Sequence, residues 1–222
     1  MIQDKIKYLS SFTDQEWGIY AFSRDPLYKK INPTLMNEFI EKSIECGHNQ
    51  AKLLLEKYPN KSIKEIANIF NLEINVKDSY GTDNYIMFAC YNSPNKITLF
   101  KQNIELGKEF IREEQIAPLL ENVNIEDLLI AHELFHYFEE KIPEIYTKNA
   151  KIVLWSIGKF QYKSRLVAVS EIAAMCFAKE LLSLSYNPFV FDVLMLYPHN
   201  WEKTDRLFND ITAIIEGVNN YE

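Results

Sequence analysis

The segment HELFH, residues 132–136, stands inside a helical pattern that runs over residues 125–141. Two histidines four positions apart lie one turn apart on one helix face, so the imidazoles of His132 and His136 can bind one metal ion. Glu133 follows the first histidine and can act as general base toward a water molecule at that metal. Two ordinary histidines on a helix remain the alternative, but they would have to share this spacing by chance. The segment therefore predicts a metal site with hydrolytic chemistry.

A catalytic zinc ion takes three protein ligands and keeps one position open for water. No further histidine closely follows the motif, so a carboxylate from another helix is expected. Glu171 is the candidate, because it stands in an apolar helix, where a charge is costly unless it is paired or bound to a metal. Small side chains on its helix, at Ala168, Ala174 and Ala178, would let the two helices approach closely. The alternative is an ion pair between Glu171 and an Arg or Lys such as Arg165.

The chain around these segments predicts an α+β fold in a single globular unit. Residues 1–33 are rich in aromatics and are expected to be irregular. Residues 34–58 are expected to form a helix that Gly47 bends or splits. Together, residues 1–58 should form an N-terminal helical appendage packed on a core domain of residues 59–222.

The core domain is expected to hold one small sheet of three or more strands, followed by helices. Residues 62–70 begin with a capping box and predict a short helix. Residues 150–163 are ambiguous, and residues 152–155 before Gly158 could form a hairpin strand. The expected strands lie near 72–76, 85–91 and 97–100, with a turn over 78–84. The expected later helices lie near 104–116, 125–141, 165–184 and 201–217.

Composition and charge exclude several classes of protein. The chain has 222 residues and a net charge of −7, which speaks against a general nucleic-acid binder. Residues 63–70 resemble the start of a helix-turn-helix, but an alternating segment follows in place of a basic helix. No apolar run approaches the length of a membrane span. The three cysteines lie far apart, which fits a reducing compartment. We therefore expect a soluble cytoplasmic protein with no nucleic-acid or membrane partner.

The sequence resembles the ImmA/IrrE family of metallopeptidases. The resemblance rests on HELFHYFE at residues 132–139 and on E-x-x-A-x-x-F-A-x-x-L-L at residues 171–182. The order of short helix, strand, apolar strands and motif helix also fits, and the resemblance covers residues 60–190. Two departures are Met175, where the family often has Asn or Asp, and Ser183-Leu184 in place of the common Met-Pro.

The resemblance implies a zincin-like fold and a soluble intracellular enzyme. It implies one zinc ion per chain, held by His132, His136 and Glu171, with Glu133 as the catalytic residue. Better-understood members act on helix-turn-helix repressors, so a repressor-like protein substrate is implied.

The sequence therefore predicts a zinc metalloendopeptidase that hydrolyses peptide bonds in a protein. The alternative is a non-catalytic zinc-containing regulatory protein that acts by binding a partner protein, because a retained Glu133 only permits catalysis. Zincin sites often use a Tyr or His to stabilise the tetrahedral intermediate. No single tyrosine stands out for that role, and His199, in a loop, is a weak candidate.

Overall fold

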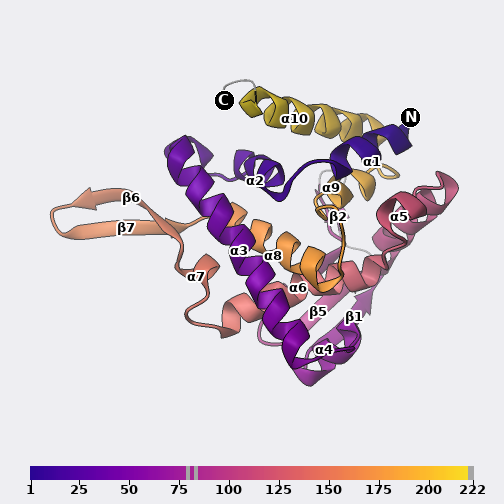
Figure 1. The fold of residues 1–222 in the computed structure, drawn as a ribbon, viewed down its shortest axis with the longest axis horizontal. Helices are drawn as coiled ribbons and strands as arrows, with labels where there is room; N and C mark the ends of the chain where they lie inside the picture. Colours follow the sequence, from indigo (N-terminus) through magenta and orange to yellow (C-terminus); the bar gives the residue numbers. More distant parts are fainter. Residues whose placement is uncertain (79–80, 83–84, 220–222) are drawn as a thin grey trace.

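The structure, a computed structural model, describes residues 1–78, 81–82 and 85–219 and has an α+β architecture. Figure 1 shows the arrangement of its elements. The helices are α1 (Ile2–Ser10), α2 (Asp14–Ser23), α3 (Pro33–Lys57), α4 (Ile63–Ile69), α5 (Lys101–Glu113), α6 (Ile125–Lys141), α7 (Tyr146–Asn149), α8 (Val167–Leu181), α9 (Val190–Leu194) and α10 (Trp201–Asn219). The strands are β1 (Glu73–Lys77), β2 (Gly81–Thr82), β3 (Tyr85–Ile86), β4 (Ala89–Asn92), β5 (Lys96–Phe100), β6 (Lys151–Ile157) and β7 (Phe160–Arg165).

Helix α6 carries the HELFH segment and has the boundaries that the sequence predicts. Its N-cap is Asn124, whose side chain accepts a hydrogen bond from the main-chain N–H of Asp127 at 3.0 Å. The acids Glu126 and Asp127 lie in the first turn, at the positive end of the helix dipole. Lys141 lies in the last turn, at its negative end, so all three charges stabilise the helix. These local signals fix where the helix begins and ends.

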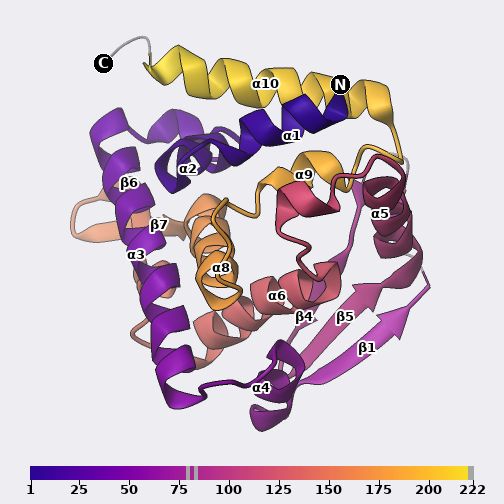
Figure 2. The same cartoon turned by 45° about the vertical axis from the view of Figure 1, so that its right-hand side comes forward.

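Helices α6 and α8 pack against each other at the centre of the molecule, and α3 lies along α8 (Figures 1 and 2). Phe135 of α6 and Phe177 of α8 are fully buried, with ring centroids 5.7 Å apart. Burial of each such ring stabilises the fold by roughly 1.5–3 kcal/mol. Ala131 and Ala174 are also fully buried, which agrees with the expected close approach.

Gly47 does not split α3, which runs unbroken over Pro33–Lys57, so that part of the expectation is wrong. The glycine serves a close helix contact. A Cβ built at Gly47 would lie 2.3 Å from the carbonyl oxygen of Ala173 and 2.9 Å from the main-chain nitrogen of Phe177. The missing side chain thus lets the backbone of α3 approach that of α8.

The predicted three-stranded sheet is confirmed, with strand order β1-β5-β4. β1 runs parallel to β5, and β4 runs antiparallel to it. The long predicted strand over 85–91 is wrong, because the chain divides there into β3 and β4. The Asn103 side chain donates a 2.7 Å hydrogen bond to the carbonyl of Met87 between them. Of the turn expected over 78–84, residues 79–80 and 83–84 lie outside the described residues, and 81–82 form β2, which pairs with β3.

The expectation that residues 1–33 are irregular is also wrong, because they contain α1 and α2. Helix α2 begins with a capping box, in which Thr13 and Glu16 bond each other's main chain. Six consecutive residues of α2, from Trp17 to Phe22, are buried. A helix that is apolar all round has no periodic stripe, so the sequence pattern gives no sign of it.

The ambiguous residues 150–163 are resolved by the antiparallel hairpin of β6 and β7. Its two-residue turn is Gly158-Lys159, with Gly158 at a φ of +58°. Figure 1 shows the hairpin reaching well away from the helical body. None of the helices in the described part of the chain is long and apolar enough to cross a membrane.

Candidate metal centre

The donor atoms of His132, His136 and Glu171 meet at one point between α6 and α8. The two Nε2 atoms lie 3.1 Å apart, and the Glu171 carboxylate oxygens lie 3.4 Å from that of His132 and 3.7 Å from that of His136. Ligands about 2.1 Å from a tetrahedral zinc ion would lie about 3.4 Å from one another. The three donor atoms therefore lie together at a spacing that fits zinc, while metal binding itself stays a prediction.

Two polar side chains, Ser170 and Glu139, fix the orientation of the His136 ring. Its Nδ1 lies 3.3 Å from Ser170 Oγ, and the Ser170 hydroxyl donates to Glu139 Oε2 at 2.8 Å. If Nδ1 carries the proton, it donates to Ser170, and the lone pair of Nε2 faces the donor cluster. Such supporting groups hold ligand histidines in metal sites. Nδ1 of His132 is buried and has no hydrogen-bond partner among the described residues.

The charges in the cluster stabilise one another. Burial alone would lower the pKa of His136, but the Glu139 carboxylate, 3.8 Å from its Nδ1, and the charges of Glu171 and Glu133 raise that pKa to about 9. Burial would raise the pKa of Glu171, but His132, whose Nε2 lies 3.4 Å from the carboxylate, and the charges of His136 and Arg24 lower it to about 2. Glu171 thus stays ionised in this site, as a carboxylate metal ligand must.

Glu171 is less buried than the sequence predicts, because 37% of its side-chain surface stays exposed. Its ion pairs are with the two histidines. Arg165, the alternative partner, has an exposed side chain, and no ion pair joins the two among the described residues. The geometry therefore disagrees with the alternative in which Glu171 only pairs with Arg165.

Glu133 lies beside the donor cluster and is 8% exposed. The main-chain N–H of Tyr91 donates a hydrogen bond to Glu133 Oε2 at 2.6 Å. Tyr91 belongs to β4, the edge strand of the sheet next to α6. The sheet thus holds the carboxylate in place by one oxygen, and the other can accept a proton.

A cleft of about 340 Å³ opens on His132, Glu133 and Glu171. The rest of its wall is mostly apolar, and much of it comes from segments outside the two motif helices. The apolar lining residues are Ile86, Met87, Phe88, Ala89, Leu128, Leu129, Met175, Pro188, Phe191, Met195, Leu196 and Leu207.

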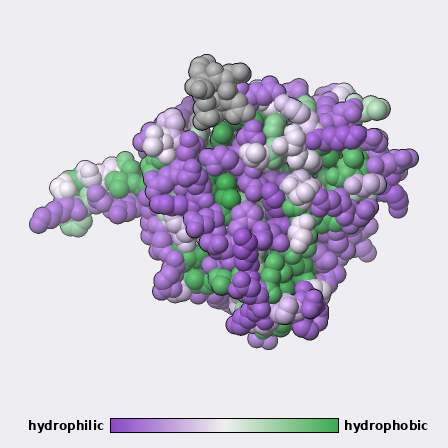
Figure 3. All heavy atoms as spheres, viewed as in Figure 1, coloured by the Kyte–Doolittle hydropathy of each residue, from purple (hydrophilic) through white to green (hydrophobic). Residues whose placement is uncertain are grey.

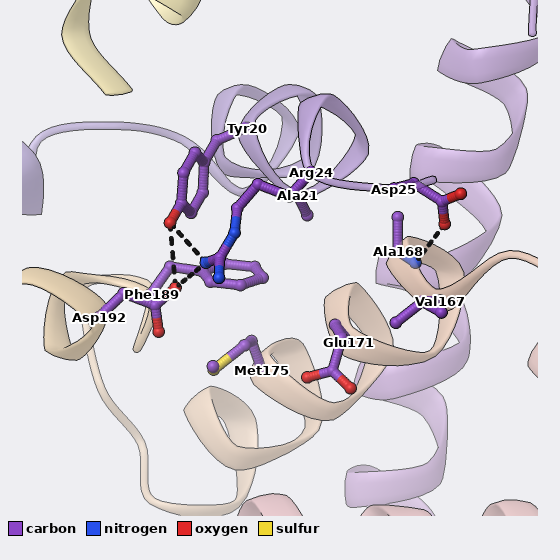
Figure 4. A pocket seen from close by; sticks show the side chains of 10 residues that line it. All are labelled: Tyr20, Ala21, Arg24, Asp25, Val167, Ala168, Glu171, Met175, Phe189 and Asp192. Atoms are coloured by element: carbon purple, nitrogen blue, oxygen red, sulfur yellow. Dashed lines mark hydrogen bonds and ion pairs between the residues drawn. The ribbon is translucent and has the colours of Figure 1, made fainter. Parts of the chain in front are cut away.

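Arg24 lines this cleft and also an adjoining cavity of about 420 Å³ (Figure 4). Its guanidinium donates to Tyr20 Oη at 2.7 Å and to Asp192 Oδ2 at 3.0 Å. Tyr20 in turn donates to Asp192 at 3.2 Å. Burial raises the pKa of Asp192, although the charge of Arg24 and the hydrogen bond from Tyr20 oppose that shift. The sequence gives no sign of this cluster, because its residues are far apart in the chain and Arg24 follows the unrecognised α2.

Two other histidines lie outside the donor cluster. His199 packs its ring against Phe88, 6.1 Å between centroids, and does not line the cleft. His48 lies near Asp14 and Cys176, close enough for these three to hold a metal ion. Lys179, however, donates to both oxygens of Asp14, at 2.8 and 3.0 Å, and already neutralises that carboxylate. We therefore interpret this second group as a structural charge network.

Comparison with known proteins gives no relative for this chain. A scan against protein-family models, a search of curated proteins and a search of solved structures each found no match. The resemblance to the ImmA/IrrE family therefore stays a hypothesis based on the two motifs, and the function has to be argued from the site.

Proposed function

We propose that this chain is a zinc metallopeptidase with a zincin-like fold that hydrolyses peptide bonds in a protein substrate. The observation that carries the proposal is that three potential ligand atoms from two packed helices lie together beside Glu133. The Glu133 side chain is buried and accepts a hydrogen bond from the main chain of Tyr91. A structural zinc site is closed by a fourth protein ligand, whereas a site with three protein ligands beside a cleft is typical of catalytic zinc, and here His132 and Glu171 line the cleft.

In the proposed reaction, His132, His136 and Glu171 hold the metal. Zinc bound there would polarise the scissile carbonyl and lower the pKa of the attacking water. Glu133 accepts the proton of that water and passes it to the leaving amine. The N–H of Tyr91 keeps the Glu133 carboxylate at a fixed position for both transfers.

The cleft supports a particular kind of substrate. Its volume of about 340 Å³ and its mostly apolar wall suit one large apolar side chain next to the scissile bond. Arg24 stands at the boundary of the cleft and can bind a substrate carbonyl or stabilise negative charge as it develops. The repressor-like substrate and the cytoplasmic location implied by the family resemblance are part of this proposal.

The test combines metal analysis with hydrolysis. Protein purified without added metal should contain about one zinc per chain, and His132→Ala should lose it. A quenched fluorescent peptide library should be cleaved next to large apolar residues. Glu133→Gln should keep zinc and fold but lose cleavage, because Gln cannot accept the water proton.

Each result separates the proposal from its alternative. Failure to bind zinc when it is supplied would reject both the enzyme and the zinc-containing regulator. Proteins that co-purify with the Glu133→Gln variant serve as candidate substrates. Bound zinc with no cleavage of these proteins or of the peptide library would favour the non-catalytic regulator. Unchanged cleavage by Glu133→Gln would reject the role of that residue.

A further inference from the structure

The hairpin of β6 and β7 exposes an apolar face to solvent. Trp155 pairs across the strands with Tyr162, and Ile157 pairs with Phe160. Residues directly opposite each other in an antiparallel pair share a face. The exposed fractions of these four side chains are 52% and 54% for the first pair and 71% and 81% for the second. Figure 3 shows the hairpin standing out from the body, with hydrophobic and hydrophilic residues side by side.

Such an arm needs a partner surface. A two-stranded hairpin alone in water is marginally stable at best, and large exposed apolar side chains mark interaction sites. The stacking of Trp155 on Tyr162, 5.6 Å between ring centroids, is an internal contact that leaves both rings about half exposed. We therefore expect these apolar side chains to be buried against a surface outside this chain.

The hairpin is also the basic part of an acidic protein. Residues 151–165 hold four bases and no acid, a net charge of +4, whereas the other 207 residues hold 20 bases and 31 acids, a net charge of −11. The basic side chains of Lys151, Lys159, Lys163 and Arg165 are all exposed and form no ion pair within the described residues. Their charge is available to an anionic surface.

The chemical character of the side chains changes along the hairpin, from the tip toward the body. The most exposed apolar pair, Ile157 and Phe160, lies next to the tip, and the amphipathic rings of Trp155 and Tyr162 come next. The bases other than Lys159 lie behind them, toward the body. Trp and Tyr concentrate at membrane interfaces, and clustered bases bind anionic headgroups. Lys159, in the turn, can extend its ammonium back to the phosphates.

We propose that this hairpin is an arm that attaches the protein to the surface of an anionic phospholipid bilayer. The apolar tip enters the headgroup boundary, the rings lie at the interface and the bases contact phosphates. Each strand, of six or seven residues, is about 20 Å long, which is more than two Debye lengths of ~8 Å, so the acidic body is screened from the lipid. The expectation of no membrane partner rested on the lack of a spanning segment, which a surface arm does not need.

The arrangement favours a bilayer over a second copy of the chain. Two hairpins facing each other would bring together two charges of +4, and four side chains a side cover much less than the ~800 Å² of a standard interface. A convex tip also needs a groove on a protein partner, whereas a bilayer adapts to it. The proposal does not rest on the metal site.

The test uses the full chain and vesicles of phosphatidylcholine with about 30 mol% phosphatidylglycerol, measured by co-sedimentation. Binding should be at least about tenfold weaker on pure phosphatidylcholine and should fall as salt rises. The double variant Ile157→Ser/Phe160→Ser should lose at least about tenfold in binding. Its control, Leu53→Ser on α3, removes an apolar residue of similar exposure, 59%, and should change binding less than about twofold.

A second pair of variants tests the charge. Lys159→Glu/Lys163→Glu should abolish binding, whereas Lys29→Glu/Lys30→Glu, exposed on the body, gives the same net charge and should retain it. Circular dichroism melts should be unchanged, because all these side chains are exposed. The proposal is overturned if folded protein binds no anionic vesicle, or if body and arm variants lose binding equally. It is also overturned if Ile157→Ser/Phe160→Ser converts a dimer to a monomer in analytical ultracentrifugation, since a second copy then covers the arm.

Discussion

At the level of single residues, His136 can offer Nε2 to a metal only while its other nitrogen carries the proton. Ser170 sits where it enforces that state, with its hydroxyl turned to Glu139. We expect Ser170→Ala to weaken zinc affinity by about 10–100-fold, because the ring loses its hydrogen-bond partner and its fixed orientation. Competition with a chromogenic chelator measures the affinity.

The matched control is Ser164→Ala, whose hydroxyl donates to the neighbouring main-chain carbonyl of Arg165 in β7, at 3.2 Å. It should leave zinc affinity unchanged. Equal affinities for Ser170→Ala and the unmodified protein would show that the packing of α6 alone orients the ring.

A second prediction about a single residue concerns Arg24. Replacing Arg24 with Gln removes the cation between the two cavities but leaves a polar side chain of similar length. We expect kcat/KM for a cleaved library peptide to fall by about tenfold or more, with zinc content unchanged. Arg165→Gln, an exposed arginine on the hairpin, should retain full activity. A loss of zinc with Arg24→Gln would instead assign Arg24 to the support of Glu171.

At the level of elements, the contact of α3 with α8 depends on a glycine. Gly47→Ala places a Cβ 2.3 Å from the Ala173 carbonyl oxygen, so the helices must separate. We expect the free energy of unfolding to fall by about 1–3 kcal/mol, although Ala is the better helix former. In α10, a Cβ at Gly217 meets nothing within 4 Å. Gly217→Ala should therefore raise the free energy of unfolding by about 0.5 kcal/mol. Urea denaturation of both variants checks the opposite signs.

The same elements show how far the sequence could be interpreted. Helix α6 was predictable because its cap, its period and its charged ends agree within 18 residues. The HELFH segment and Glu171 were found because the chemistry lies in local patterns on two helices. Helix α2 has no periodic apolar stripe, because its residues from Trp17 to Phe22 are all buried, so the sequence pattern predicts neither this helix nor the place of Arg24. The cleft depends on contacts between distant segments, which no local pattern encodes.

At the level of the whole molecule, a charge network ties the N-terminal helices to α8. His48 of α3 lies 2.8 Å from Glu180 and 3.4 Å from Asp14 of α2. Asp14 also accepts hydrogen bonds from Lys179 and from Asn187, at 2.8 and 2.9 Å. Burial would raise the pKa of Asp14, but the hydrogen bonds from His48, Lys179 and Asn187 lower it well below its usual range. The network thus joins α2, α3 and α8 through one partly buried carboxylate.

This network makes stability depend on pH. The hydrogen bond to Asp14 raises the pKa of His48; burial opposes the shift, and Glu180 adds to it. A raised pKa in the folded state means that the stabilisation is complete below the unfolded value of about 6.5 and is lost as pH rises through the folded value. The lowered pKa of Asp14 acts at the other end: its stabilisation is present above about pH 4 and is lost as pH falls.

We therefore expect the stability advantage of the unmodified protein over His48→Gln to be largest near pH 6 and to shrink by about 0.5–1 kcal/mol near pH 9. His136 also titrates in this window, but it does so in both proteins, so its contribution cancels in the difference. Urea unfolding in chelator-containing buffer keeps the metal state of the two proteins the same. Parallel stability curves from pH 6 to 9 would show that His48 is held by packing, because a charged pair with Asp14 and Glu180 must weaken as the imidazolium loses its proton.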